Sequence, residues 1–279
     1  MEEDYGIKPD VLNYDDVRKM VPWFEGKERL VNWLLRVLSV DKVNWLHRHN
    51  CATPGAPFVA GLLKDLEIKL DIRGQERLDN LPQGAFITVS NHTFGALDGI
   101  ILIHMLASRR PQFKVMVNMV LNYITAMRPN FIAVDALATD DPEKRSVSLK
   151  GIREAMMHVK RGNPLGFFPA GAVSKFSRNF HIEDRQWQPT IIRLIQQLKV
   201  PVIPIYFHGH NSLWFNFLGV VSWQLRTLRL PAEVFRKKGS TFRISVGEMI
   251  SADEIAQHPD TQELGEFLKQ KTYAMRKWK

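Results

Sequence analysis

A histidine and an aspartate in the segment SNHTFGALDGI (residues 90–100) are the side chains whose types and spacing best suit chemistry. A neutral histidine beside a carboxylate is an oriented general base, because the carboxylate fixes the ring tautomer and stabilises the imidazolium that forms. On a continuous helix, His92 and Asp98 would point about 240° apart, so the chain must turn between them. Gly95 supplies the backbone freedom for that turn. The spacing therefore predicts a histidine base that a carboxylate holds at the start of a helix.

The same two residues also permit a purely structural interpretation. A carboxylate at a helix start is favoured by the unpaired backbone amides and by the helix dipole, so Asp98 could serve only as a cap. His92 would then be an ordinary loop histidine. The pair by itself leaves both interpretations open.

The segments around the pair alternate between strand-like and helical patterns. GAFITVSNH (residues 84–92) is an apolar run rich in β-formers, so His92 follows the end of a strand, and residues 98–110 have a helical pattern. The other expected elements are strands at 66–74, 113–118, 131–136, 164–171, 200–209 and 241–250, and helices at 141–161 and 189–199. This alternation predicts an α/β fold with a mixed, partly parallel sheet flanked by helices.

Three polar segments follow predicted strands: the one that contains His92, the FPAGAVS turn (168–174) and HGHNS (208–212). Ligands of open α/β sheets collect outside the carboxyl ends of the strands. We therefore expect these segments to border one cleft.

The first 60 residues have helical patterns that end near CATPGAPFVAG (51–61), where prolines and glycines indicate a boundary. We expect an N-terminal helical, membrane-associating segment at 1–60 and a catalytic domain at 61–279. The single cysteine, Cys51, excludes an intrachain disulfide and a cysteine-built zinc site.

The formal charge of +9 indicates polyanionic partners. A nucleic-acid module would interleave basic and aromatic residues on its surface, whereas the aromatics here cluster with Leu and Val, so no nucleic acid is expected. The acidic start MEEDYGIKPD lacks the features of a signal peptide, and we expect a peripheral protein on the cytoplasmic face of the inner membrane.

Two stretches, 30–47 and 213–230, combine large apolar residues with basic ones, but neither supplies the roughly 20 uninterrupted apolar residues of a membrane span. Such segments suit a membrane surface, or alternatively pack onto the core. Basic residues there would also attract an acidic acyl carrier protein. The residues predicted for this membrane or carrier-protein surface are Trp33, Trp45, Trp214, Arg226, Arg229, Arg236, Lys237 and Lys238.

Four blocks together resemble one known family. SNHTFGALDG is similar to the N-H-x-x-x-x-D motif of the glycerolipid acyltransferases, the PlsC-like lysophosphatidate acyltransferase group. PNFIAVD (129–135), FPAGAVS (168–174) and VPVIPIY (200–206) resemble that family's second, third and fourth blocks, in the same order. The resemblance covers roughly residues 65–250. It implies an enzyme with the acyltransferase fold and a role in membrane lipid synthesis.

Residue by residue, the resemblance implies that His92 deprotonates an acceptor hydroxyl, which attacks an acyl thioester, and that Asp98 orients His92. The donor would be acyl carrier protein or acyl-CoA, the acceptor a lyso-lipid on an anionic membrane surface, and no cofactor or metal is expected. Backbone amides around Gly171 would stabilise the oxyanion, and Phe94 and Phe168 would line the acyl channel. Further acceptor-binding candidates are Arg128, Ser174, Lys175 and Arg178.

The chain also departs from the family pattern. Five residues separate His92 from Asp98 where the family has four, and we expect Gly95 to absorb the extra one. Val134 and Val173 stand where the family has arginines, which are the favoured partners of phosphate. An acceptor with a carboxylate, such as a lyso amino-acid lipid of the N-acyl glycine or ornithine type, is therefore preferred over lysophosphatidate, which stays the alternative.

Other chemistries find less support. A hydrolase with Ser174 as nucleophile would need a G-x-S-x-G turn, which GAVSKF lacks. His208 and His210 could ligate a metal, but no carboxylate follows nearby, so structural roles are preferred. His181, beside Glu183 and Asp184, is expected to be a solvated loop histidine.

Overall fold

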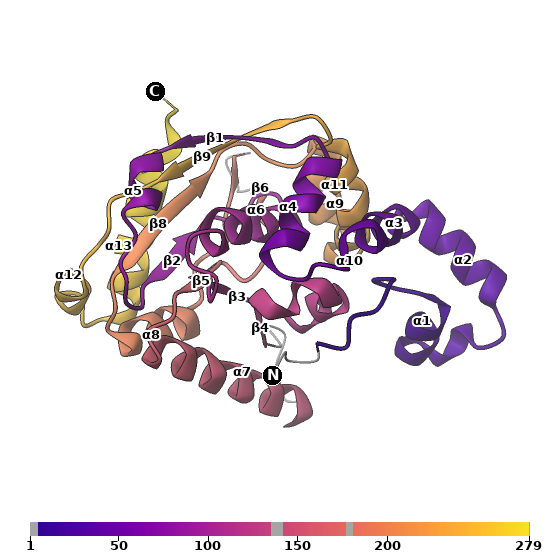
Figure 1. The fold of residues 1–279 in the computed structure, drawn as a ribbon, viewed down its shortest axis with the longest axis horizontal. Coiled ribbons are helices and arrows are strands. Elements are labelled where there is room, and N and C mark those ends of the chain that lie inside the picture. The colour runs from indigo at the N-terminus through magenta and orange to yellow at the C-terminus, as the bar shows by residue number, and fades with distance from the viewer. Residues whose placement is uncertain (1–4, 135–141, 177–180, 279) are drawn as a thin grey trace.

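A seven-stranded sheet forms the centre of the computed structural model, which describes residues 5–134, 142–176 and 181–278, with only the backbone for 142–147 (Figure 1). The strand order is β1-β9-β8-β2-β5-β3-β4, and every neighbouring pair is parallel except β8 with β9. The predicted mixed α/β fold is thus confirmed. The strands are β1 Lys69–Arg73, β2 Ile87–Ser90, β3 Lys114–Asn118, β4 Phe131–Val134, β5 Leu165–Phe167, β8 Val202–Phe207 and β9 Thr241–Val246, with β6 Lys175–Phe176 and β7 Ile182–Glu183 as a separate antiparallel pair.

Helices cover both faces of this sheet. Alternate residues of β3 point to opposite layers: Val115 and Val117 join one hydrophobic cluster and Met116 joins the other. The first layer contains α4 Ala56–Asp65, α5 Gln75–Asp79 and α6 Ala96–Ala107, and the second contains α7 Pro142–Lys160, α8 Pro189–Leu198, α12 Ala252–Ala256 and α13 Thr261–Tyr273, which η4 Ala274–Arg276 follows. Because α6 lies between the sheet and α4, most of its side chains are buried, which explains its almost continuous apolar sequence.

The N-terminal residues form an arm that extends from this body (Figure 1). It consists of α1 Tyr14–Met20, η1 Pro22–Phe24, α2 Glu28–Val37 and α3 Val40–Asn50. The boundary predicted after residue 60 falls inside α4, where Phe58 and Leu62 belong to the core. Pro57 lies in the first turn of that helix, where proline starts a helix rather than breaking it.

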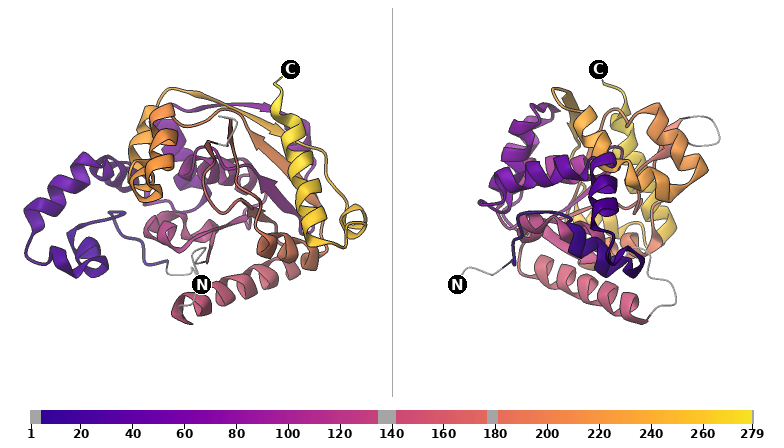
Figure 2. Two further views of the ribbon diagram at one scale, coloured as in Figure 1. Left: turned by 180° about the vertical axis from the view of Figure 1, so that it is seen from behind. Right: turned by 90° about the vertical axis from the view of Figure 1, so that its right-hand side faces the viewer.

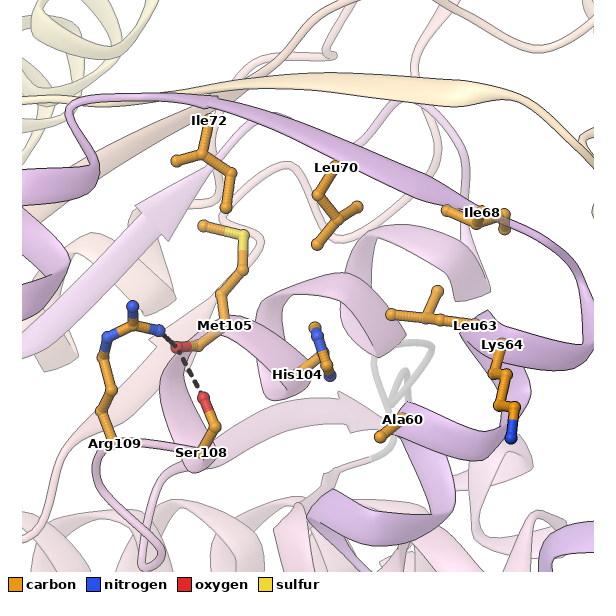
Figure 3. Close-up of a pocket in the computed structure, with 10 residues that line it drawn as sticks. All are labelled: Ala60, Leu63, Lys64, Ile68, Leu70, Ile72, His104, Met105, Ser108 and Arg109. Atoms are coloured by element: carbon orange, nitrogen blue, oxygen red, sulfur yellow. Dashed lines mark hydrogen bonds between the residues drawn. The ribbon is translucent and has the colours of Figure 1, made fainter.

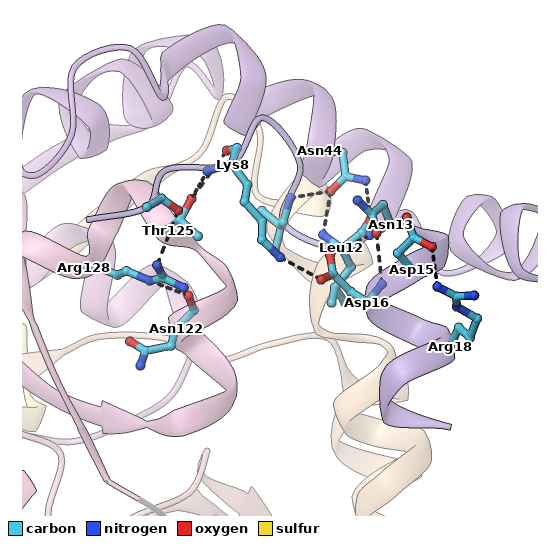
Figure 4. Close-up of polar contacts among 12 residues, drawn as sticks. Lys8, Leu12, Asn13, Asp15, Asp16, Arg18, Asn44, Asn122, Thr125 and Arg128 are labelled. Carbon is cyan, nitrogen blue, oxygen red and sulfur yellow. Dashed lines mark hydrogen bonds and ion pairs between the residues drawn. The ribbon is translucent and has the colours of Figure 1, made fainter. Parts of the chain in front are cut away.

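Polar contacts fix the start of the arm to the body (Figure 4). The Lys8 amide donates to Thr125 Oγ1 at 3.0 Å, while within the arm the Val11 amide donates to Asn44 Oδ1 at 2.9 Å. Arg128 donates to the carbonyls of Tyr5 at 2.6 Å and of Asn122 at 3.0 Å. The contacts of Thr125 and Arg128 join the arm to the helical turns η2 Met119–Tyr123 and η3 Thr125–Asn130.

His47 on α3 joins the same two parts through both ring nitrogens. Its Nδ1 donates to Pro9 O at 3.1 Å and its Nε2 accepts from the Ala126 amide at 3.4 Å, so the ring is neutral in this arrangement. Only 1% of the residue is exposed, and burial lowers the pKa of His47 although the nearby Asp10 carboxylate opposes the shift. Protonation would put an N–H against the Ala126 amide.

We expect stability to fall as the pH drops from about 7.5 to about 5.5, because the unfolded histidine, with a pKa of about 6.5, takes up its proton before the folded one. His104, His158 and His208 also have a pKa lowered by burial and act in the same direction. The free energy of unfolding of His47→Gln, which has no ionisable ring at this position, should depend less on pH than that of the native protein. Urea titrations at both pH values measure the free energy of unfolding. The same change with pH in the native protein and in His47→Gln would contradict a neutral, buried His47.

A group of three short helices is inserted between β8 and β9: α9 Leu213–Val221, α10 Trp223–Leu228 and α11 Leu230–Arg236. The Ser212 hydroxyl accepts from the Phe215 amide at 3.1 Å and thereby caps α9. The buried Glu233 accepts from the Ser212 amide at 2.9 Å and from its hydroxyl at 2.7 Å, which ties α11 to the start of α9. Among the described residues, no helix is both long and apolar enough to cross a membrane.

Candidate active site

His92 and Asp98 meet at the carboxyl end of β2, as the sequence predicts. His92 Nδ1 lies 2.9 Å from Asp98 Oδ2, and that oxygen also accepts from the amides of Phe94 at 2.8 Å and Gly95 at 3.0 Å. Gly95 has φ +77°, so it absorbs the extra residue between them. The capping role and the orienting role of Asp98 therefore coexist in one carboxyl group.

The hydrogen bonds select one form of the histidine ring. Asp98 Oδ2 accepts hydrogen bonds from two amides, so this oxygen carries no proton that it could donate to His92. The hydrogen between them therefore belongs to His92 Nδ1, and Nε2 keeps its lone pair. The ring stacks on Phe168 at 4.4 Å between centroids, and its side chain is 18% exposed. Complete burial raises the pKa of Asp98, while the His92 ring and the two amides oppose that shift. This geometry is that of an oriented general base.

A second buried carboxylate, Asp184, holds the backbone of His92. Its Oδ1 accepts from the His92 amide at 3.1 Å and from the Ser174 hydroxyl at 2.6 Å, and its Oδ2 accepts from Trp187 Nε1 at 3.2 Å. The Ser174 amide donates to His92 O at 2.7 Å. His181, predicted to be a solvated loop histidine, is exposed, whereas its neighbour Asp184 is only 4% exposed. The hydroxyl of Ser174, a predicted acceptor-binding residue, takes part in this buried network.

Arg226 on α10 holds the other side of the same loop. Its guanidinium donates to Ser174 O at 3.2 Å and to Val173 O at 3.3 Å, and burial lowers the pKa of Arg226. The prediction that Arg226 lies on a surface is wrong, since the residue is 5% exposed. The side chain points inward because Gly219 has no Cβ to fill the space that it occupies.

Replacement of Asp184 with asparagine is expected to lower the free energy of unfolding by about 1–3 kcal/mol. The amide can keep one acceptor for His92 and Ser174, but its NH₂ group would then face the Trp187 N–H. Glu183→Gln, at the neighbouring and less buried position, is the matched control and should change stability little. Urea unfolding of the two variants checks this, and equal stabilities would contradict the role of Asp184.

A cavity of about 300 Å³ opens beside the His92 ring. It lies at the carboxyl ends of β3, β4 and β5, and its wall is mostly apolar, with Met116, Phe131, Val134 and Phe167 among the contributors. His92, Asn118, Ser148, Gln188 and Thr190 are its polar lining residues in the described part of the chain, where no Lys, Arg, Asp or Glu lines it. The cavity thus offers a neutral, largely apolar space next to the base.

The predicted wall residues divide between this cavity and the core. Phe168 lines the cavity, but Phe94 does not, because its ring packs edge-on against Phe242 at 4.7 Å in the core. Gly171 lines the cavity, yet its amide already donates to Phe168 O at 2.9 Å and is not a free oxyanion donor.

Neither of the two predicted acceptor-binding cations that the structure describes lines the cavity. Lys175 is exposed on β6, Arg128 binds carbonyls of the arm, and Arg178 lies outside the described residues. The aromatic residues predicted for a surface are more than half exposed: Trp33, Trp45 and Trp214. Of the basic residues predicted there, Arg236 and Lys238 are exposed, whereas Arg229 and Lys237 are half-buried and Lys237 donates to His210 O at 2.9 Å.

Gln188 is a site residue that the sequence reasoning missed. Its carboxamide lies directly against Gly171, so that a Cβ at that glycine would overlap it, and it lines the cavity with His92. The backbone amide of Gln188 donates to Pro169 O at 2.8 Å, which fixes the residue beside the third motif block. The only sequence signal was its place before Pro189 at a helix start.

A second cavity of about 400 Å³ lies between α4, β1 and α6, away from the His92 pair (Figure 3). Two of its polar side chains have protein partners: Arg109 donates to Asp79 at 2.8 Å and Ser108 donates to Met105 O at 3.3 Å. His208 likewise pairs with Ser245 Oγ at 2.8 Å. Within the described residues, no group of three or more His, Cys, Asp and Glu side chains is placed to hold a metal ion.

A family model described as "Acyltransferase" matches residues 19–278, which is most of the chain and includes every site residue described above. The chain belongs to this acyltransferase family. The enzyme class and the resemblance to glycerolipid acyltransferases that the motifs predicted are confirmed.

Two curated relatives are similar to this acyltransferase over nearly its whole length. Both are named lyso-glycine lipid O-acyltransferase. The protein of Bacteroides thetaiotaomicron is 25% identical over 268 residues, which are 92% of each chain, and that of Phocaeicola vulgatus is 22% identical over 274 residues, 93% of this chain and 94% of the relative. A solved structure, the 1-acyl-sn-glycerophosphate acyltransferase PlsC from Thermotoga maritima, is 13% identical, covers 78% of this chain and 80% of its own, and superposes with a TM-score of 0.48.

Proposed function

We propose that this acyltransferase moves a fatty acyl group from a thioester to the hydroxyl of a lyso-lipid, with His92 as general base. His92 Nε2 takes the hydroxyl proton while the hydroxyl oxygen attacks the thioester carbonyl, and Asp98 stabilises the resulting imidazolium. The tetrahedral intermediate then collapses, the carbon–sulfur bond breaks, and the thiol leaves with the proton from His92. No covalent acyl-enzyme is required.

One observation supports this assignment above the others: the lone pair of His92 Nε2 lies at the wall of a cavity while Asp98 fixes the opposite nitrogen. An apolar cavity suits an acyl chain, and Phe168 is our candidate for the wall of that channel. Since the Gly171 amide is engaged, we assign stabilisation of the oxyanion to the Gln188 carboxamide beside it.

The acceptor that we propose is a lyso amino-acid lipid of the N-acyl glycine or ornithine type. Val134, at the position of the family's phosphate-binding arginine, forms part of the cavity wall, and the described lining offers no cation to a phosphate. Asn118, Gln188 and Thr190 offer neutral hydrogen bonds that suit an amide. The names of the two curated relatives support the same choice.

For the donor we propose acyl carrier protein or acyl-CoA, and for the N-terminal segment at 1–60 an association with the cytoplasmic face of the inner membrane. The exposed Trp33 and Trp45 on the arm support that association, since tryptophan favours the membrane interface. The exposed Lys175, and Arg178 outside the described residues, are kept as candidates for the acceptor carboxylate.

An acceptor competition tests the proposal. The purified protein is given an acyl carrier protein thioester together with equal amounts of a lyso N-acyl glycine lipid and lysophosphatidate, and the products are separated by mass. We expect acylation of the glycine lipid to exceed that of lysophosphatidate by about tenfold or more, since one unmatched charge interaction contributes at least 1.4 kcal/mol. Preferential formation of phosphatidate would contradict the acceptor assignment.

A further inference from the structure

The outward face of α9 and α10 is apolar in a way that a soluble surface helix is not. Between residues 213 and 228 the only charged side chain is Arg226, and it is buried. A helix on the surface of a soluble protein places its apolar side chains inward and its charged ones outward, so this arrangement is reversed. The exposed large apolar residues of the two helices are Leu213, Trp214, Phe217, Val220, Val221, Trp223, Leu225 and Leu228.

The two helices hold this face outward by contacts on their other side. Phe215 and Asn216 are each 1% exposed, and the Asn216 side chain donates to the carbonyls of Asn211 and Ser212. Arg226 reaches inward over the Phe215 ring at 5.5 Å. The exposed residues are therefore the ones that the core leaves out, and they form one patch, since α9 and α10 pack against each other.

Basic residues follow the patch directly in the chain. Arg229 directly follows α10, and the exposed Arg236 and Lys238 end the inserted group. The arm helices α2 and α3, with exposed Trp33 and Trp45, lie at the same end of the molecule as α9 and α10 (Figures 1 and 2). Aromatic and aliphatic side chains followed by cations fit the surface of an anionic bilayer, where the rings lie among the acyl chains and the cations meet the headgroups.

We propose that α9 and α10 form a hairpin that inserts into the interface of an anionic lipid bilayer and seats the enzyme there. At 1.5 Å per residue the nine residues of α9 extend only about 14 Å, which is too short to cross a hydrocarbon core of about 30 Å but sufficient to lie in the interface. Residues 213–228 contribute no exposed charge that would oppose this insertion.

The hairpin is joined to the catalytic loop. Arg226 binds the carbonyls of Val173 and Ser174, and the backbone amide of Ser174 in turn donates to His92 O. At the start of α11, Leu230 packs so close to Gly95 that a Cβ there would lie 2.9 Å from it. A seated hairpin therefore holds the His92 loop near the bilayer surface. This consequence rests on the proposed function, because it matters only if the acceptor is a membrane lipid.

Vesicle co-sedimentation of the full chain tests whether the α9–α10 hairpin binds the bilayer. Vesicles of equal parts phosphatidylglycerol and phosphatidylcholine are mixed with the native protein and with the double variant Phe217→Glu/Val221→Glu, whose two positions are each more than half exposed. We expect the variant to bind roughly tenfold more weakly or worse, because two carboxylates would enter the interface. The matched control is Met249→Glu, another exposed apolar position, which lies by the opposite end of β8 and should bind like the native protein.

Membrane binding by the hairpin would be contradicted if the native protein and the double variant bound vesicles equally, or if Met249→Glu lost binding to the same extent. It would also be contradicted if the double variant kept its vesicle binding and instead lost binding to acyl carrier protein or self-association. Acyl transfer to detergent-dispersed acceptor is measured on the same proteins. That activity should persist in the double variant. If the native protein lacked acyl transfer activity, the proposed function would be contradicted. The vesicle assay tests membrane binding by the hairpin independently of that activity.

Discussion

His92→Ala is expected to reduce kcat for acyl transfer by about 10²- to 10⁴-fold, the range over which a positioned general base contributes. The ring supplies the only basic nitrogen on the described wall of the cavity, and no other described lining residue can take the hydroxyl proton near neutral pH. KM for the acceptor should change much less, because the cavity wall is otherwise intact. Steady-state kinetics with a thioester donor measure both constants.

The control for this change is His181→Ala, which removes an exposed histidine that does not line the cavity and should leave kcat unchanged. His92 is partly exposed and its side chain bonds only to Asp98 among the described residues, so the His92→Ala protein should fold. A kcat within about threefold of the native value would contradict the general-base assignment.

Asp98→Asn is expected to cost activity by about 10²-fold or more and to lower stability as well. An asparagine oxygen can still accept from the amides of Phe94 and Gly95, but it cannot stabilise an imidazolium, and its NH₂ group would take the place of Asp98 Oδ1, a buried atom with no hydrogen-bond partner in the described structure. If the amide turns instead, its NH₂ group meets His92 Nδ1 and favours the tautomer that protonates Nε2. Either orientation weakens the base.

If Asp98 only capped the helix, the Asp98→Asn protein would be less stable than the native protein but equally active. The distinguishing readout is therefore kcat measured at a temperature where unfolding experiments show the Asp98→Asn protein to be fully folded. A native kcat under that condition, combined with a lower unfolding midpoint, would reduce Asp98 to a helix cap.

The sequence predicted the parts of the structure that depend on local pattern. The apolar run before His92 and the freedom of Gly95 were enough to place the base at a strand end and to bring it to Asp98, because both follow from neighbouring residues. The order of strands and helices likewise followed from periodicity. Pro57, which contributed to the predicted boundary, lies in the first turn of α4, where a proline begins a helix.

The residues that sequence reasoning missed or misplaced act through contacts between distant segments. Asp184 lies 92 residues from His92 in the chain and Arg226 lies 52 residues from Ser174, so no spacing rule connects them. Arg226 occurs in a stretch of apolar residues where a cation is normally solvent-exposed, and the space at Gly219 that turns it inward is visible only in three dimensions. Phe94, adjacent to the catalytic turn, belongs to the core for the same reason.

The most direct test of the central claim is the formation of ester product from a lyso N-acyl glycine lipid and an acyl carrier protein thioester, followed by mass spectrometry for the native protein and for His92→Ala. We predict O-acylated lipid and an equal amount of released thiol with the native protein, and a loss of both of about 10²-fold or more with His92→Ala. Equal product from the two proteins, or no ester from the native protein on this lipid or on lysophosphatidate, would contradict a His92-dependent acyl transfer.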